Sequence, residues 1–144
     1  MLDMDDVLED QPLGYLLSRV ANTLRSEVAA TVLDPLGVAF PQYICMRILS
    51  KNPGRSSAEL ARHTNVTPQA MNMVLRSLQD RGLVTRPVSV SAGRSLPAEL
   101  TREGEELLKR TDSGVRAAEK KVMAKLTAEQ RREFKRILVM LGSD

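Results

Sequence analysis

Residues 56–86 read SSAELARHTNVTPQAMNMVLRSLQDRGLVTR, a stretch that carries two helix-start signals in succession. The first signal is Ser56 with Glu59 three residues later, which is the capping-box pattern. It predicts a short helix over about residues 57–63. The apolar residues that this helix is expected to bury are Ala58, Leu60 and Ala61.

The second signal is Thr67 followed by Pro68, an oxygen-bearing cap before a proline at the first helical position. It predicts a helix over residues 68–81, and Gly82 supplies the left-handed residue that commonly follows a helix. The surface of this helix carries two stripes at helical spacing, which indicates two roles. The apolar stripe consists of Met71, Val74, Leu75 and Leu78, and the other consists of Gln69, Asn72, Met73 and Arg76.

Beyond Gly82 the helical period gives way to alternation, which predicts a β-hairpin. One strand is expected over residues 84–91 and the hairpin tip over residues 92–95. The returning strand is expected over residues 96–100, where Pro97 limits it to an edge or to imperfect pairing. A short helix, a four-residue turn, a second helix and a hairpin in this order describe a winged helix-turn-helix.

In such a module the second helix enters the major groove of double-stranded DNA, so its outward stripe must be able to read base edges. Gln69 and Asn72 suit adenine, while Arg76 suits guanine or a phosphate. Arg94 at the hairpin tip suits the adjacent minor groove, which is negatively charged. The predicted DNA-binding residues are Ser56, Thr67, Gln69, Ala70, Asn72, Met73, Arg76 and Arg94, with Arg55, Arg62 and Arg81 as weaker candidates for backbone contacts.

Charge and composition favour a polyanionic partner and exclude several other classes. Residues 51–94 hold seven basic and two acidic side chains, whereas residues 1–34 hold seven acidic and two basic ones. An aromatic content of 3% is too low for a surface that stacks single-stranded nucleic acid. A single cysteine, Cys45, and a single histidine, His63, exclude an internal disulfide and a zinc site built on Cys and His ligands of one chain.

Long amphipathic helices are predicted on both sides of the module. One runs from Pro12 to about Leu33, where Pro35 and Gly37 stop it, and another long helix is capped by Thr101. The fold class is therefore mainly α, of the α+β type, with 144 residues in one domain. Its expected parts are dimerisation helices in residues 1–35 and 102–144 and a winged helix-turn-helix module in residues 40–101.

The apolar stripes of the terminal helices need a partner, because a monomer would leave them exposed to water. A two-fold homodimer would bury them. The predicted dimerisation residues are Leu13, Leu16, Leu17, Phe134, Ile137, Leu138 and Leu141.

The stretches SAELARHTNVTPQAMNMVLRSLQDRGLV and LTREGEELL resemble the MarR family of bacterial transcriptional regulators, and the resemblance extends over nearly the whole chain. It implies a homodimer that binds a pseudo-palindromic operator and is often released from it by small phenolic or other aromatic ligands. The wing departs from the family pattern, since Ala92, Gly93 and Arg94 stand where relatives commonly carry Asp-Arg-Arg. This departure predicts weaker or differently braced anchoring in the minor groove.

The resemblance also implies a ligand pocket between the winged module and the dimerisation helices, a kind of crevice that ligands generally prefer. Arg86 interrupts an apolar strand face and suits a carboxylate, as does Arg19 of the first helix. Tyr43 and Met46 would supply an apolar floor. The sequence and this resemblance together predict a cytoplasmic repressor, and the resemblance implies that it responds to an aromatic acid or a phenol.

Two alternatives remain open at this stage. The first is a redox-sensing regulator that acts through Cys45, and the second is a winged-helix module that binds proteins rather than DNA. The first predicts a response to oxidants, and the second predicts no salt-dependent binding to duplex DNA. No pair of residues suits catalysis, so neither enzyme activity nor a cofactor or metal is expected, and no segment has the length and apolarity of a membrane span.

Overall fold

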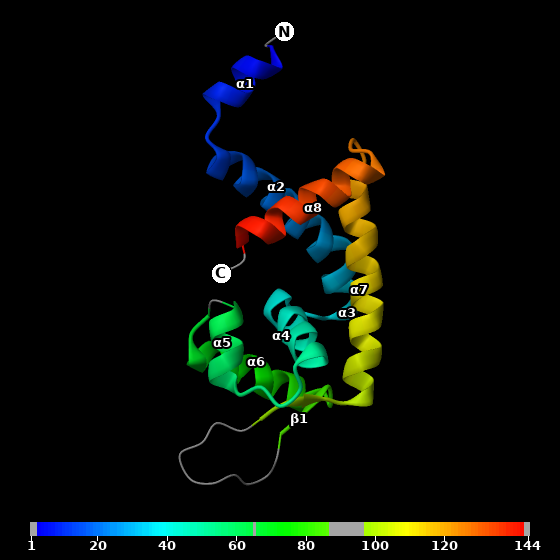
Figure 1. Ribbon diagram of the computed structural model, residues 1–144. Coiled ribbons are helices and arrows are strands. Elements are labelled where there is room, and N and C mark those ends of the chain that lie inside the picture. The colour runs from blue at the N-terminus through cyan, green and yellow to red at the C-terminus, as the bar shows by residue number, and fades with distance from the viewer. Residues whose placement is uncertain (1–2, 65, 87–96, 143–144) are drawn as a thin grey trace.

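The computed structural model describes residues 3–64, 66–86 and 97–142. It is mainly helical, with one small antiparallel sheet (Figure 1). The N-terminal elements are α1 (Met4–Asp10), α2 (Leu13–Val28), the π-helical turn η1 (Ala29–Leu33) and α3 (Asp34–Leu36). The others are α4 (Phe40–Lys51), α5 (Ser57–Thr64), α6 (Pro68–Asp80), β1 (Val84–Thr85), β2 (Glu99–Leu100), α7 (Arg102–Val122) and α8 (Ala128–Gly142).

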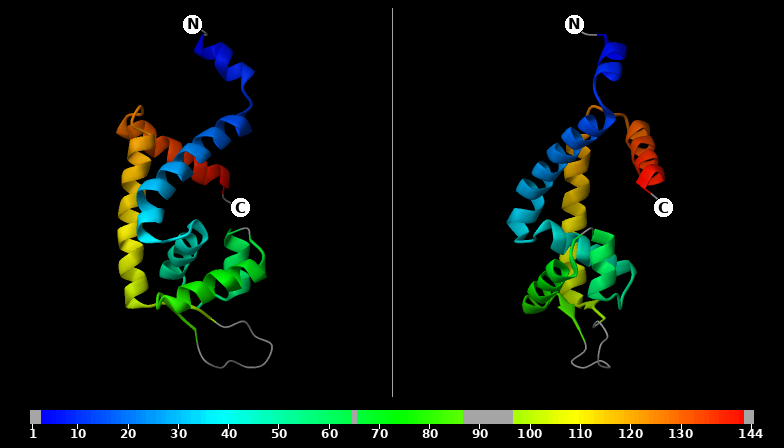
Figure 2. Two further views of the ribbon diagram at one scale, coloured as in Figure 1. Left: turned by 180° about the vertical axis from the view of Figure 1, so that it is seen from behind. Right: turned by 90° about the vertical axis from the view of Figure 1, so that its left-hand side faces the viewer.

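These elements form two regions. The winged module gathers α4, α5, α6 and the two strands at one end of the molecule, and α2 and α8 lie at the other end (Figure 1). Helix α7 runs from the strands to the corner with α8 and joins the two regions (Figure 2). This arrangement confirms the predicted fold class of a winged helix-turn-helix carried by long terminal helices.

The predicted N-terminal helix is present and ends at Gly37 as predicted, but it extends to Leu36 rather than to about Leu33. The helix continues through η1 and α3, and it ends at Gly37, whose φ of 66° only glycine adopts at low cost. Pro35 lies inside the last turn and does not end the helix. The π-helical turn immediately before it changes the hydrogen-bond pattern, so the missing N–H of proline is tolerated. Helix α1 was not predicted, and none of its seven residues is buried.

The core of the winged module lies between α4, α5 and α6. Both predicted cap signals are formed: the N–H of Ala70 donates to Thr67 Oγ1 at 3.1 Å, and the N–H of Glu59 donates to Ser56 Oγ at 3.3 Å. The expected burial of Ala58 is wrong, since this side chain is exposed. The side chains with 2% exposure or less in this core are Cys45, Met46, Leu49, Leu60, Ala61, Met71, Leu75 and Leu78.

The sheet confirms the predicted return of the chain after α6. Strands β1 and β2 are antiparallel, with Val84 opposite Leu100. A third segment joins them through a bridge between Arg55 and Ala98, which the sequence did not indicate. The predicted hairpin tip, with Ala92, Gly93 and Arg94, lies outside the described residues, as does most of the predicted alternation.

Two close contacts fix α7 against the rest of the chain. Thr101 caps the helix, with its Oγ1 accepting the N–H of Gly104 at 3.1 Å. Gly104 then packs directly on the backbone of Leu83, and Gly114 packs on the side chain of Val32 in η1. Helix α7 therefore lies close to both the winged module and the N-terminal helices.

Two further observations bear on function. Within the described part of the chain, no single helix is long and apolar enough to cross a membrane, although the bent pair of Leu13–Leu36 and Phe40–Lys51 passes that test by length and composition. Among the same residues, no group of three or more His, Cys, Asp or Glu side chains is placed to hold a metal ion.

Candidate nucleic-acid interface

Helix α6 buries one face and exposes the other. Met71, Leu75 and Leu78 are completely buried against the core of the module. On the opposite side Met73 keeps 71% of its surface exposed, which is a high value for an apolar residue. The described residues thus include a fully solvated helix face, and its exposed members are Gln69, Asn72, Met73 and Arg76.

The first turn of α6 is oriented by its cap. Thr67 Oγ1 accepts a hydrogen bond from the N–H of Ala70, so this side chain orients the start of the helix. The Thr67 side chain is also exposed to solvent. Ala70 is half-buried, so any DNA contact that it makes is limited to part of its surface. The exposed N-terminal turn of a helix carries free N–H groups and a partial positive charge, which is suited to a phosphate.

Ser56 and Arg55 are tied into local structure. The Ser56 hydroxyl lies 3.2 Å from Glu59 Oε1, and Arg55 Nη1 lies 2.5 Å from Glu59 Oε2. These contacts hold the pKa of Glu59 below its ordinary value, with the Arg55 hydrogen bond as the largest cause. The predicted phosphate contact of Ser56 stays a prediction. It requires the Ser56 hydroxyl to bind a phosphate in addition to its hydrogen bonds with Glu59.

The other predicted backbone contacts are placed differently from one another. Arg62 is exposed on α5. Arg81 donates from Nη1 to the carbonyl of Gly37 at 2.6 Å, so it ties the end of α6 to the turn before α4. Arg86 is half-buried at the base of the wing. Burial lowers the pKa of Arg86, and the nearby positive charge of Arg76 lowers it further.

A cavity of about 470 Å³ lies where the winged module meets the longer helices. Its wall combines apolar side chains with four cations and two carboxylates. The cations are Arg25, Arg47, Arg116 and Lys135, and the carboxylates are Asp112 and Glu119. The apolar and aromatic lining comes from Ala21, Leu24, Val28, Phe40, Tyr43, Ile44 and Val115.

A polar cluster of three side chains forms part of this wall. Tyr43 and Arg47 lie one turn apart on α4, and both donate to Asp112 Oδ1 on α7, at 2.5 Å and 2.6 Å respectively. The guanidinium carbon of Arg47 also lies 5.9 Å from the centre of the Tyr43 ring. Burial raises the pKa of Tyr43 to about 12, and the hydrogen bond to Asp112 adds to the effect. The hydrogen bond to Asp112 likewise raises the pKa of Arg47.

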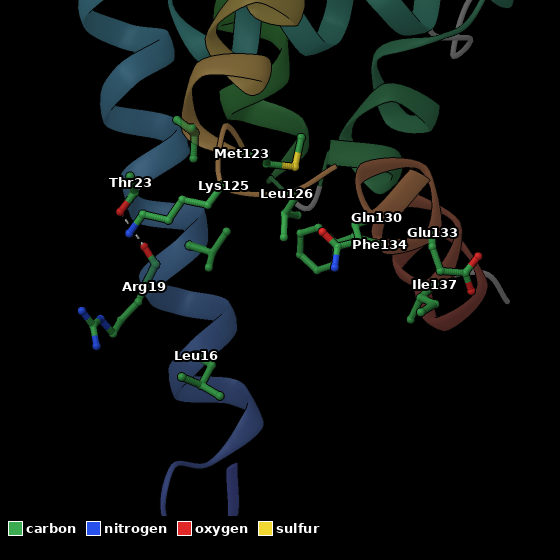
Figure 3. Close-up of a pocket in the computed structure, with 12 residues that line it drawn as sticks. Leu16, Arg19, Thr23, Met123, Lys125, Leu126, Gln130, Glu133, Phe134 and Ile137 are labelled. Atoms are coloured by element: carbon green, nitrogen blue, oxygen red, sulfur yellow. Dashed lines mark hydrogen bonds between the residues drawn. The ribbon is translucent and has the colours of Figure 1, made fainter. Parts of the chain in front are cut away.

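A second, larger cavity of about 710 Å³ opens between α2 and α8. In Figure 3, Leu16 on α2 and Phe134 on α8 stand on its two sides, with Met123 and Leu126 between them. Three of the predicted dimerisation residues line it: Leu16, Phe134 and Ile137. The remaining four, Leu13, Leu17, Leu138 and Leu141, are exposed in the single chain.

The four predicted ligand residues are not brought together. Tyr43 lines the smaller cavity, Arg19 lines the larger one, and Arg86 lies near Cys45 and Arg76. Met46 is fully buried in the core. Sequence reasoning missed Arg47 and Asp112, although the spacing of Tyr43 and Arg47 on one helix face was a usable signal.

The environment of Cys45 bears on the redox alternative. This side chain has no exposed surface, and burial raises the pKa of its thiol to about 12. Oxidation requires an accessible thiolate, and neither condition is met here. The described structure therefore gives no support to a sensor that acts through Cys45.

Comparison with known proteins is consistent with this geometry. The sequence pattern of the MarR family matches residues 36–95. The HTH-type transcriptional repressor Rv2887 of Mycobacterium tuberculosis is 62% identical over 136 residues, which covers 94% of this chain and 97% of that protein.

Solved structures of the MarR family protein Rv2887 have the same fold. Its complex with DNA gives a TM-score of 0.82 at 57% identity, covering 93% of this chain and 100% of that chain. Its complex with salicylic acid gives a TM-score of 0.76 at 61% identity, covering 94% of this chain and 99% of that chain. Since the similarity spans nearly the full length of both proteins at this level of identity, the chain belongs to the MarR family.

Proposed function

We propose that the chain is a homodimeric transcriptional repressor that binds a pseudo-palindromic operator and is released from it by a small aromatic acid or phenol. The observation that carries this proposal is the exposed face of α6, whose opposite face is completely buried in the winged module. The similarity to a repressor whose structures include DNA and salicylic acid supports it. A cytoplasmic location and the absence of catalytic activity belong to the same proposal.

The exposed face of α6 has the chemistry for base readout. Gln69 and Asn72 can each form paired hydrogen bonds with adenine, and Arg76 can do so with guanine. The cap at Thr67 orients the first turn, where a recognition helix usually meets the bases. The guanidinium groups of Arg76 and of the half-buried Arg86 add positive charge on this side of the module.

Dimerisation follows from the exposed apolar surface of α2 and α8. A single chain leaves Leu13 66% exposed and Leu141 72% exposed, together with the groove between the two helices. A two-fold partner would cover this surface. The two copies of α6 would then have to lie one DNA turn apart, about 34–36 Å, to enter successive major grooves.

The smaller cavity is the better candidate for the ligand. It lies between α4 of the winged module and the longer helices, so its occupant contacts both regions. The lining of the larger cavity includes three side chains that are predicted to pack in the dimer, Leu16, Phe134 and Ile137. A ligand changes operator affinity only by its difference in affinity for the two dimer conformations, typically about 1–3 kcal/mol.

The variant Arg76→Ala tests the DNA side of the proposal. Loss of one base or phosphate contact should weaken binding to a promoter fragment by about 1–3 kcal/mol, as measured by fluorescence anisotropy. The matched control is Arg110→Ala, which removes an exposed arginine from α7. Equal affinities of Arg76→Ala and the wild type, or wild-type binding that ignores salt concentration, would contradict the proposal.

A further inference from the structure

One carboxylate joins the winged module to α7 inside the smaller cavity. Asp112 Oδ1 accepts hydrogen bonds from both Tyr43 and Arg47 of α4. Among the described residues, Arg47 uses only its Nη1 atom for this contact, and Asp112 Oδ2 receives no hydrogen bond. Arg47 therefore meets a carboxylate through one nitrogen, although its guanidinium can bind one through two.

This contact is accessible to a competitor. The side chain of Arg47 is 42% exposed and that of Asp112 is 20% exposed, so water reaches both groups. The cavity around them contains two more cations than carboxylates, and the rest of its wall is largely apolar. Such a wall suits an anion with a flat apolar body, and a carboxylate on that body would meet Arg47 and Tyr43.

We propose that Asp112 is a built-in competitor that occupies the carboxylate position of the ligand, and that an aromatic carboxylate displaces it from Arg47 and Tyr43. The inference rests on the proposed function and names the regulation of the same cavity. Because Tyr43 and Arg47 belong to α4 while Asp112 belongs to α7, the exchange removes a polar tie between the two regions. The ligand then favours the conformation in which this tie is open, and DNA favours the one in which it is closed.

The variant Asp112→Asn tests this exchange, because it removes the charge and keeps the size of the side chain. The matched control is Glu105→Gln, which removes an exposed carboxylate from the same helix away from the cavity. The probes are salicylate and its neutral amide, salicylamide. Affinities for both are measured by isothermal titration calorimetry, and DNA affinity is measured by anisotropy with and without each probe.

We expect Asp112→Asn to bind salicylate about tenfold more tightly than the wild type, since a hydrogen bond to a charged group has this strength. Its affinity for salicylamide should change less than twofold. Without a probe, its DNA affinity should fall, because the tie is already weakened. The loss of DNA affinity that salicylate causes, typically about 5- to 150-fold for such coupling, should become smaller.

The variant Arg47→Lys provides a second measurement. It keeps the positive charge beside Asp112 but loses the planar fork, so salicylate should bind more weakly while salicylamide is little affected. Thermal melting of each variant checks that it is folded.

The outcomes separate the inference from the proposed function. If the wild type binds DNA and responds to salicylate while Asp112→Asn titrates like the wild type, the inference is overturned and the proposed function stands. An equal gain for salicylamide, or the same gain in Glu105→Gln, also overturns the role of the carboxylate. If the wild type ignores DNA, or if salicylate leaves its DNA affinity unchanged, the proposed function fails and the inference fails with it.

Discussion

Replacement of Gly104 by alanine should weaken the junction between α7 and the wing. An added Cβ at this position would lie 2.2 Å from the carbonyl oxygen of Leu83 and 3.1 Å from Leu100 Cδ2. The Leu83 carbonyl is not free to move, since it also accepts the N–H of Thr101 at 3.0 Å. Ordinary contacts require about 3.5 Å, so the helix and the strand must separate by about 1 Å.

The cost of this separation follows from two opposing effects. Overpacking costs about 1–3 kcal/mol, and a clash with backbone belongs at the upper end of this range. Alanine is better than glycine inside a helix by about 1 kcal/mol. The free energy of unfolding should therefore fall by about 2 kcal/mol, which lowers Tm by about 4–8 °C in a domain of this size.

Urea denaturation followed by circular dichroism measures this change, at one protein concentration because the proposed dimerisation would contribute to stability. The matched control is Gly14→Ala in α2, where an added Cβ meets nothing within 4 Å. This control should be as stable as the wild type or up to about 1 kcal/mol more stable. A Gly104→Ala protein that is as stable as the control would refute the packing argument.

Three further predictions follow from the described contacts. Burial raises the pKa of Cys45 to about 12, so its thiol should resist a thiol reagent at pH 8 until the protein unfolds, and rapid labelling of the native protein would contradict this. The stability that the protonated thiol contributes below pH 9 should be lost as the pH rises toward 12. The variant Thr67→Ala removes the acceptor for the N–H of Ala70 and should cost about 1 kcal/mol in urea denaturation, and an unchanged midpoint would show that the cap is dispensable. Arg55 holds the pKa of Glu59 below its ordinary value of 4.5, so an NMR titration of Arg55→Ala should find this pKa raised toward 4.5. In the wild type, the stabilisation from Glu59 is present above pH 4.5 and is lost as the pH falls through the lowered pKa.

The local signals in the sequence predicted the winged module well. Caps act within three or four residues, so Thr67 and Ser56 could be recognised without knowledge of the tertiary structure. The stripes of α6 were also correct, because the burial of Met71 and the exposure of Met73 follow from helical spacing. The same reasoning failed for Ala58, whose exposure depends on how α5 packs against its neighbours.

Features that depend on distant segments were missed. The bridge between Arg55 and Ala98 joins a residue that precedes α6 in the sequence to one that follows it, and no local pattern predicts this pairing. Asp112 lies 65 residues after Arg47, so their ion pair could not be inferred from spacing. The neighbours of Arg86 at the wing base depend on the tertiary fold, and most of the apolar row that it was predicted to interrupt lies outside the described residues. The role of Gly104 in the LTREGEELL stretch is likewise visible only when Leu83 is placed beside it.

Helix α7 connects these observations to regulation. The winged module contacts it at several places, and two of them are Leu83 at Gly104 and the polar contacts of α4 with Asp112. Eight residues separate the two points, which is about 12 Å along a helix. A ligand that displaces Asp112 removes these polar contacts of α4 and leaves the packing at Gly104, so the module is expected to pivot about the wing base rather than to separate from α7. Such a pivot changes the direction of α6, and a dimer with redirected copies of α6 no longer matches successive major grooves.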